Sequence, residues 1–166
     1  VERLAEFCRL TLHRPNDRDW TTVGEEVQLL RSYLEIEQSR WGALLDVTID
    51  CDPALAGGQL PHFLLLPLVE NALKYGRATS PDRVGLKLKA ERGADGALVF
   101  TVANTGEWIE PATKKTVSTL GIGLENLRER LARHYPRTHR LEFSHANGWV
   151  TVVLRIFSPP RASAPL

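Results

Sequence analysis

The segment that most constrains the fold is residues 63–75, which are apolar on almost every side of a helix. A helix that is hydrophobic all round has to be buried by other elements. Pro67 fits the early turns of such a helix, where it bends or tightens them, and Gly76 is typical of its end. Its polar exceptions are Glu70, Asn71 and Lys74. The chain therefore has to fold around this helix, and the three polar side chains need a role.

Helical patterns precede this segment. Apolar residues at a spacing of three to four predict that residues 1–12 are the end of a helix. Thr22 and Glu25 form a capping box, and the single apolar face that follows predicts a long amphipathic helix over residues 23–40. This helix can pair between protomers or pack on its own domain, and its sequence does not choose between the two.

Strand patterns flank the segment. Alternation and β-branched residues predict a strand over residues 44–50. Two hairpins follow, with turns at Asp95-Gly96 and Asn147-Gly148 and with strands at residues 84–90, 97–102, 141–145 and 149–156. The proline-rich tail, residues 158–166, cannot bury enough surface to order itself. These elements predict one α+β domain.

Composition excludes several classes of function. The net charge of +1, with 25% charged residues, gives no global field for a nucleic acid, so none is expected as a partner. Two cysteines without ligand spacing argue against a zinc site and favour a reducing compartment. No apolar run is long enough to span a bilayer. We expect a cytoplasmic domain, and any membrane anchor would lie in a part of the protein outside this chain.

Asn71 is the first candidate for chemistry. An amide inside an apolar helix loses its water, and leaving it unpaired costs about 1 to 3 kcal/mol, so it needs a partner. A neighbouring backbone group is one candidate. Mg²⁺ is the other, since it takes hard oxygen ligands and leaves most of its positions to water and phosphate oxygens. Taken alone, Asn71 favours the backbone partner.

A pair of glycines before a helix is the second candidate. Gly121 and Gly123 precede the apolar face of Leu124, Leu127 and Leu131. Glycines there let the backbone approach a phosphate, and the free N–H groups of a helix start favour an anion. A tight turn explains the same glycines equally well. No P-loop or dinucleotide motif supports them.

The order of three boxes points to a family. Residues 68–76 (LVENALKYG), 102–106 (VANTG) and 121–131 (GIGLENLRERL) resemble the N box and the two glycine boxes of sensor histidine kinases. The resemblance is to their ATP-binding domain, most closely in the LytS-like subgroup with a short ATP lid. It covers roughly residues 22–156, since Glu25-Glu26, residues 33–37 and Arg40 also resemble that subgroup's linking helix.

The resemblance implies a fold and a division of the chain. The fold would be the two-layer α/β sandwich of the histidine kinase-like ATP-binding type, with a mixed sheet covered on one face by helices and with an N-terminal helical segment. Residues 1–41 would be the end of the helical dimerisation and phosphotransfer region, and residues 42–157 the ATP-binding catalytic domain. Residues 107–120 would be the lid, and residues 158–166 a disordered tail.

The resemblance also implies a binding site for ATP and Mg²⁺. Asn71 would bind magnesium, and Lys74 would approach a phosphate. Gly106 would lie beneath adenine, and the glycines of the third box beneath the phosphates. The nucleotide-binding residues would be Asn71, Lys74, Asn104, Gly106, Gly121, Ile122, Gly123 and Leu124.

Two residues depart from the family pattern. Asn104 stands where the family usually has an aspartate that accepts a hydrogen bond from the adenine amino group. Its amide oxygen can still accept, without charge assistance, at a loss of about 1 kcal/mol. Trp108 replaces a glycine, and its ring either stacks near the base or plugs the root of the lid.

The implied reaction is phosphoryl transfer rather than hydrolysis. Pro67 stands where the hydrolysing relatives have a carboxylate that activates water, so we expect little ATP hydrolysis. Glu70 adjoins Asn71 but points about a hundred degrees round the helix, which assigns it to structure. The γ-phosphoryl group would go to a histidine and then to a response regulator, in a protein that forms a homodimer.

The acceptor histidine is expected upstream of Val1. Residues 61–64 (PHFL) superficially copy the family's acceptor motif, but His62 lies directly before the N box and cannot easily face its own γ-phosphate. This chain would then bind ATP without phosphorylating itself, and it contains no catalytic residue of its own. The alternative is a degenerate nucleotide site, marked by Asn104 and Trp108, that serves dimerisation or regulatory partner binding.

Overall fold

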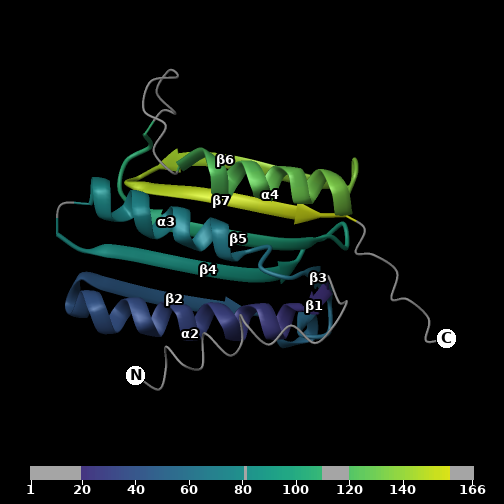
Figure 1. The fold of residues 1–166 in the computed structure, drawn as a ribbon, viewed down its shortest axis with the longest axis horizontal. Helices are drawn as coiled ribbons and strands as arrows, with labels where there is room; N and C mark the ends of the chain where they lie inside the picture. The colour runs from purple at the N-terminus through teal and green to yellow at the C-terminus, as the bar shows by residue number, and fades with distance from the viewer. Residues whose placement is uncertain (1–19, 81, 110–119, 158–166) are drawn as a thin grey trace.

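The computed structural model describes residues 20–80, 82–109 and 120–157, with the side chains of residues 120–122 left out (Figure 1). The predictions for residues 1–12, for most of the lid and for the tail fall outside the described residues. Within the described residues no helix is long and apolar enough to cross a membrane.

The centre of the fold is a five-stranded mixed sheet. Its order is β2-β4-β5-β7-β6, and the strands span Leu45–Cys51 (β2), Val84–Arg92 (β4), Leu98–Thr105 (β5), Trp149–Ile156 (β7) and His139–Ala146 (β6). Strands β2 and β4 are parallel, whereas the other neighbours are antiparallel. The predicted α+β sandwich with a mixed sheet is confirmed.

Both predicted hairpins are present, and their turns follow from local chemistry. Asn147 and Gly148 both have positive φ, of 52° and 73°, as a two-residue turn between twisted strands requires. Gly96 has a φ of 81°, and Gly93 donates a hydrogen bond to Ala97 across the other turn. Asparagine and glycine tolerate this backbone region at little cost, which is why these turns are readable from sequence.

Three helices lie against one face of the sheet (Figure 1). They are α2 (Val23–Trp41), α3 (Leu66–Thr79) and α4 (Leu120–His134). Buried residues that alternate along the strands, such as Leu86, Leu88 and Phe100, meet the apolar faces of these helices in one core. Helix α3 packs on β5 and lies beside α4, so the segment that is apolar all round occupies the middle of the helical layer.

Helix α2 packs on its own domain. The capping box is confirmed: Thr22 Oγ1 accepts from the Glu25 N–H at 3.2 Å, and the Glu25 carboxylate accepts from the Thr22 N–H at 2.9 Å. Leu30 and Leu34 are buried in the core that α2 shares with the sheet. The sequence left the partner of this helix open, and the structure places it on its own sheet. The domain boundary at residue 41 stays a prediction.

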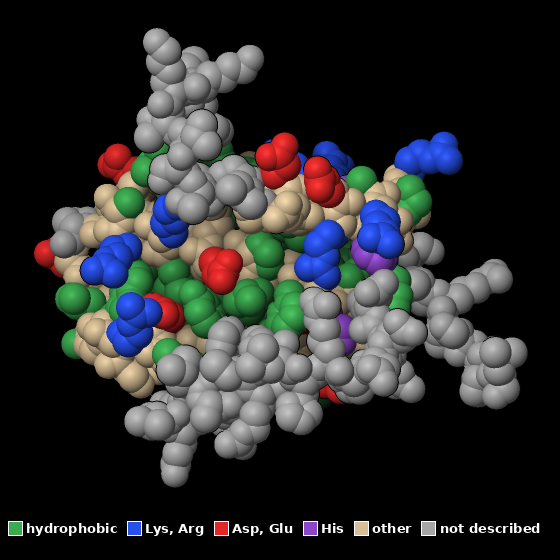
Figure 2. Space-filling model, viewed as in Figure 1, with side chains coloured by type: hydrophobic (Ala, Val, Ile, Leu, Met, Phe, Trp, Pro, Cys, Tyr) green, Lys and Arg blue, Asp and Glu red, His purple; other side chains and the backbone are tan. Residues whose placement is uncertain are grey.

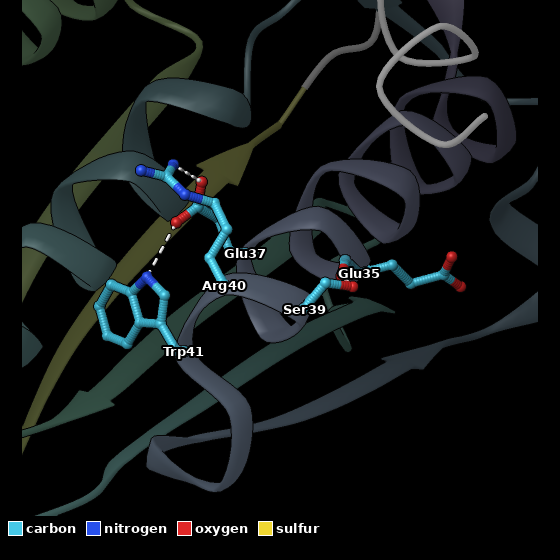
Figure 3. A network of polar contacts seen from close by, with 5 residues as sticks. All are labelled: Glu35, Glu37, Ser39, Arg40 and Trp41. Carbon is cyan, nitrogen blue, oxygen red and sulfur yellow. Dashed lines mark hydrogen bonds and ion pairs between the residues drawn. The ribbon is translucent and has the colours of Figure 1, made fainter. Parts of the chain in front are cut away.

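The C-terminal end of α2 is tied by a small polar network (Figure 3). The Glu37 carboxylate accepts from Arg40 and from the Trp41 indole, both at 3.0 Å, and the Ser39 hydroxyl donates to the carbonyl of Glu35 at 2.8 Å. The Arg77 guanidinium of α3 lies 5.2 Å from the centre of the Trp41 ring. This network joins the ends of α2 and α3.

Helix α3 begins and ends three to four residues later than the sequence predicted. It begins at Leu66 because Phe63 has a φ of 56°, outside the helical region. The buried Glu26 carboxylate accepts from the N–H groups of Phe63 and Leu65, at 3.0 and 2.9 Å, and so holds this turn. The helix continues past Gly76 to Thr79.

Gly76 serves close packing instead of ending the helix. A Cβ at this position would lie 2.7 Å from Cγ1 of Val84 and 3.5 Å from Nδ2 of Asn104. Only glycine therefore lets α3 approach β4 and β5 this closely.

The chain enters the described fold through a short strand. Strand β1 (Trp20–Thr22) pairs with β3 (Gln59–Pro61), which leads into the turn before α3. The Trp20 ring contacts the rings of His134 and Tyr135 edge to face, at centroid distances of 5.1 and 6.0 Å. Two short 3-10 turns, Gly42–Leu44 (η1) and Pro53–Leu55 (η2), complete the connections.

Candidate nucleotide-binding site

Helix α3 carries the first two predicted site residues, Asn71 and Lys74. Asn71 is half-buried, and Lys74 is exposed. Within the described residues the Asn71 amide makes no hydrogen bond. The backbone partner that Asn71 taken alone favours is not found among the described residues, and the half-buried amide keeps access to solvent. Its oxygen is available to a ligand from outside the chain.

Asn104 lies at the end of β5 with its side chain 3% exposed. Its Nδ2 donates to the carbonyl oxygen of Thr105 at 2.9 Å. No donor from the described residues reaches its Oδ1. The amide nitrogen is thus fixed by the backbone, and the oxygen remains available as an acceptor.

Gly106 follows at a position that admits no side chain. Its φ is 127°, and a Cβ would lie 2.0 Å from Oγ1 of Thr79. The same hydroxyl accepts from the Glu107 N–H at 3.0 Å and donates to the Tyr75 carbonyl at 2.8 Å. The last turn of α3 is therefore tied to the chain just after β5, which brings the first and second boxes together.

The third box lies within α4, which begins at Leu120, and its two glycines are in the first turn of the helix. Gly121 and Ile122 have only their backbone described, and Leu124 is half-buried against the core. No atom of the described residues lies within 4 Å of the position a Gly123 Cβ would take, whereas Gly76 and Gly106 are closely surrounded.

A groove of about 420 Å³ separates α3 from α4. Its lining residues are Phe63, Leu66, Pro67, Glu70, Gly123, Asn126, Leu127, Glu129 and Arg130. Gly123 of the third box thus shares a groove with Glu70, the neighbour of Asn71 in the first box. Asn71 itself is not among the lining residues. Figure 2 shows apolar side chains gathered on this face of the molecule, with charged side chains around them.

A second cavity of about 390 Å³ lies at the end of α2 and α3. Its lining residues are Arg40, Trp41, Leu44, Arg77, Ser80, Asp82 and Val84. It contains none of the eight predicted nucleotide-binding residues, whereas the groove between α3 and α4 contains Gly123. We therefore take that groove and the end of β5 that carries Asn104 as the candidate site.

Trp108 packs beside the candidate site. Its ring centre lies 5.8 Å from that of Phe143 on β6, and the Arg128 guanidinium lies 5.9 Å from the Phe143 ring. The Trp108 side chain remains 37% exposed. This packing favours the second of the two sequence interpretations, in which the tryptophan occupies the root of the lid.

Sequence reasoning missed several groove residues. Asn126 and Arg130 follow Gly123 at steps of three and four, so they lie on the same face of α4. Arg130 donates hydrogen bonds to the carbonyl groups of Phe63, at 3.2 Å, and of His62. The helical period could have found both, but the partner carbonyls could not have been foreseen. Glu70 was assigned to structure, yet it lines the groove.

Comparison with known proteins gives matches to histidine kinases. The histidine kinase family matches residues 1–45. The sensor histidine kinase BtsS of Escherichia coli K12 is 34% identical over 137 residues, which cover 81% of this chain and 24% of the relative. The sensor protein LytS of Staphylococcus saprophyticus is 31% identical over 137 residues, covering 78% of this chain and 23% of the relative. The chain thus spans about a quarter of the length of these relatives.

A solved structure agrees in fold. The catalytic domain of histidine kinase ThkA superposes with a TM-score of 0.61 at 14% identity, covering 82% of this chain and 93% of that domain. The sequence matches identify the family, and the superposition identifies the fold of its catalytic part. The chain belongs to the sensor histidine kinases, and it resembles the catalytic part of their LytS-like members.

Proposed function

We propose that this chain binds Mg²⁺-ATP, with the base beside Asn104 and the phosphates at the groove between α3 and α4. The observation that carries the proposal is the availability of Asn104 Oδ1, an acceptor held at the end of β5 next to the side-chain-free Gly106. Gly123 at the first turn of α4 supports the phosphate end, since free N–H groups there favour an anion.

The residues present fit a magnesium ion. Asn71 offers an amide oxygen without a hydrogen bond to the described residues, one turn of α3 before Lys74. Mg²⁺ accepts a single protein oxygen because water and phosphate oxygens supply the rest of its octahedron. When bound, the ion would neutralise charge on the β- and γ-phosphates. Asn71 would orient it, and Lys74 would approach a phosphate oxygen.

In the whole protein we propose transfer of the γ-phosphoryl group to a histidine and then to a response regulator. Such transfer needs positioning and charge neutralisation more than an elaborate set of catalytic groups. Pro67 offers no proton acceptor for water, which supports slow hydrolysis. A region that includes residues 1–41 would serve dimerisation and phosphotransfer, and any membrane anchor would lie in other parts of the whole protein.

Calorimetric titration of the chain with ATP and Mg²⁺ tests the binding proposal. We expect saturable binding with a Kd between micromolar and millimolar, and Asn71→Ala should abolish its dependence on magnesium. Gln28→Ala, which removes an exposed amide from α2, is the control and should bind as the unchanged chain does. No binding at millimolar ATP would contradict the proposal and favour a degenerate module that acts in dimerisation or partner binding.

A further inference from the structure

The turn before α3 is held by charged side chains from two other helices. Glu26 of α2 accepts the N–H of Phe63 with one carboxylate oxygen, at 3.0 Å, and the N–H of Leu65 with the other, at 2.9 Å. Arg130 of α4 donates from two separate nitrogens to the carbonyl groups of Phe63, at 3.2 Å, and of His62. Phe63 is therefore held from α2 through its N–H group and from α4 through its carbonyl group.

The backbone of Phe63 needs support of this kind. Its φ of 56° lies in the left-handed region, which residues other than glycine, asparagine and aspartate rarely adopt. Such a conformation persists only where its surroundings determine it, and strained residues cluster at functional sites. Phe63 and Arg130 both line the groove between α3 and α4. The strained turn and one of the groups that hold it are thus part of the candidate site.

Glu26 and Arg130 also act on each other. Glu26 is 1% exposed, and a buried carboxylate has to be compensated by hydrogen bonds or by an opposite charge. Burial raises the pKa of Glu26, whereas the N–H groups of Leu65 and Phe63 and the charge of Arg130 oppose this change. We call Glu26, Arg130 and residues 62–65 together the turn clamp, because the two charged groups act on one turn.

The turn clamp connects the two helices on which nucleotide binding depends. Asn71 is on α3, which directly follows the clamped turn, and the glycines of the third box are on α4. Gly123 and Arg130 both line the groove, so they lie on the same face of α4. A ligand that contacts both helices binds well only if the helices keep their relative position.

The fold itself has other support. Leu127 and Leu131 of α4 are fully buried in the core, and so is Leu30 of α2. These side chains hold the two helices against the rest of the domain even without the charged groups. Loss of one group of the turn clamp should therefore disturb the relative position of α3 and α4 more than the overall stability.

We propose that Glu26 and Arg130 are positioning residues of the nucleotide site, which fix the glycine-bearing turn of α4 relative to α3 by holding the 62–65 turn from two sides. This inference rests on the proposed function and adds two residues to it that act through the turn. Glu26 is not among the residues that line the groove, so its effect on binding has to pass through the turn.

Calorimetric titration of variants with Mg²⁺-ATP is the test. Arg130→Met keeps an unbranched side chain but removes its charge and its donors, and we expect a Kd about tenfold higher. Glu26→Gln should raise the Kd to a similar extent. The double variant should bind no more weakly than the weaker single variant, because both groups act through one turn. Arg133→Met, which removes an exposed arginine from the same helix, is the control and should leave the Kd unchanged.

Two further measurements separate positioning from a general loss of stability. Arg130→Lys restores the charge and a donor, so it should recover part of the affinity lost in Arg130→Met. In Arg130→Met, the amide hydrogen of Phe63 should exchange faster although its acceptor Glu26 is intact. The amide of Val102, in the middle of β5, should exchange at an unchanged rate.

Unchanged affinity in both single variants would overturn the assignment of Glu26 and Arg130. Weaker binding in Arg130→Met alone would also overturn it, since Arg130 would then act by contact with the nucleotide. Equal acceleration of exchange at Phe63 and Val102 would do the same, because it would indicate general destabilisation. Failure of the unchanged chain to bind Mg²⁺-ATP would instead overturn the proposed function.

Discussion

The two flanks of α3 are built differently. Where its last turns meet β4 and β5, the packing is so close that Gly76 and Gly106 admit no Cβ. Where its first turns face α4, a groove of about 420 Å³ remains, and Gly123 has nothing within 4 Å of its missing Cβ. One flank is fixed by contacts within the chain, and the other leaves space for a ligand. A glycine-to-alanine substitution should therefore lower the free energy of unfolding on the close-packed flank and raise it on the open flank.

The largest effect is expected for Gly106→Ala on the close-packed flank. The φ of 127° and the 2.0 Å approach to Thr79 Oγ1 should together cost about 3 kcal/mol in the free energy of unfolding, measured by urea denaturation. Gly57→Ala is the matched control, since nothing lies within 4 Å of its Cβ position. Equal losses in the two variants would contradict the packing argument.

An intermediate effect is expected for Asn104→Asp, which restores the aspartate of the family pattern. A carboxylate acceptor should strengthen ATP binding by about 1 kcal/mol, or several-fold in Kd. It cannot donate to the Thr105 carbonyl, so the free energy of unfolding should fall by about 1 kcal/mol or more. Calorimetry and urea denaturation on the same protein measure both. A gain in affinity without any loss of stability would show that the Thr105 hydrogen bond contributes nothing.

A smaller effect of opposite sign is expected for Gly123→Ala on the open flank. Alanine favours a helix over glycine, so the free energy of unfolding should rise by about 0.5 kcal/mol. The added methyl group points into open space that the proposed phosphates would use, so ATP binding should weaken. Destabilisation here, as in Gly106→Ala, would remove the difference between the two flanks.

The smallest effect concerns acid stability at the start of α2, away from both flanks. Hydrogen bonds from the Thr22 backbone and the Thr21 hydroxyl lower the pKa of Glu25. A carboxylate whose pKa is lower in the folded chain than in the unfolded chain stabilises the fold at pH values above its unfolded pKa, which is about 4.5 for Glu25. This stabilisation is lost as the pH falls through the folded pKa. The melting temperature of Glu25→Gln should therefore fall less steeply on acidification.

Glu26 provides an internal contrast to this prediction. Burial is the largest cause of its shift and raises its pKa despite the N–H groups of Leu65 and Phe63. Glu26 thus stabilises the fold at pH values below its unfolded pKa, and this stabilisation is lost as the pH rises through its folded pKa. If the melting temperatures of Glu25→Gln and Glu26→Gln changed in parallel on acidification, the opposite signs assigned to these neighbours would be contradicted.

Local chemistry made most of the fold predictable. Thr22 with Glu25, and Asn147 with Gly148, specify a helix start and a turn through residues that are adjacent in sequence. The start of α3 was not predictable, because the turn at Phe63 is held by a carboxylate 37 residues away in sequence. Gly76 was misread for the same reason, since its neighbour Val84 belongs to another element.

The candidate site also has features that could be predicted from sequence and features that could not. The residue types of the three boxes were readable as patterns, so Asn71, Asn104 and Gly123 could be proposed from sequence. The position of Glu70 in the groove could not be read, because it depends on which residues of α4 lie opposite it in space. Likewise, the Asn104 oxygen is left available only because the Thr105 carbonyl takes up the nitrogen.

The contact of Trp20 with His134 and Tyr135 has a mechanical consequence. Helix α4 has 15 residues and is therefore about 22 Å long, with the indole at one end and the glycine box at the other. Because a helix is stiff over this length, one rigid element joins the ring cluster at β1 to the glycine end of α4.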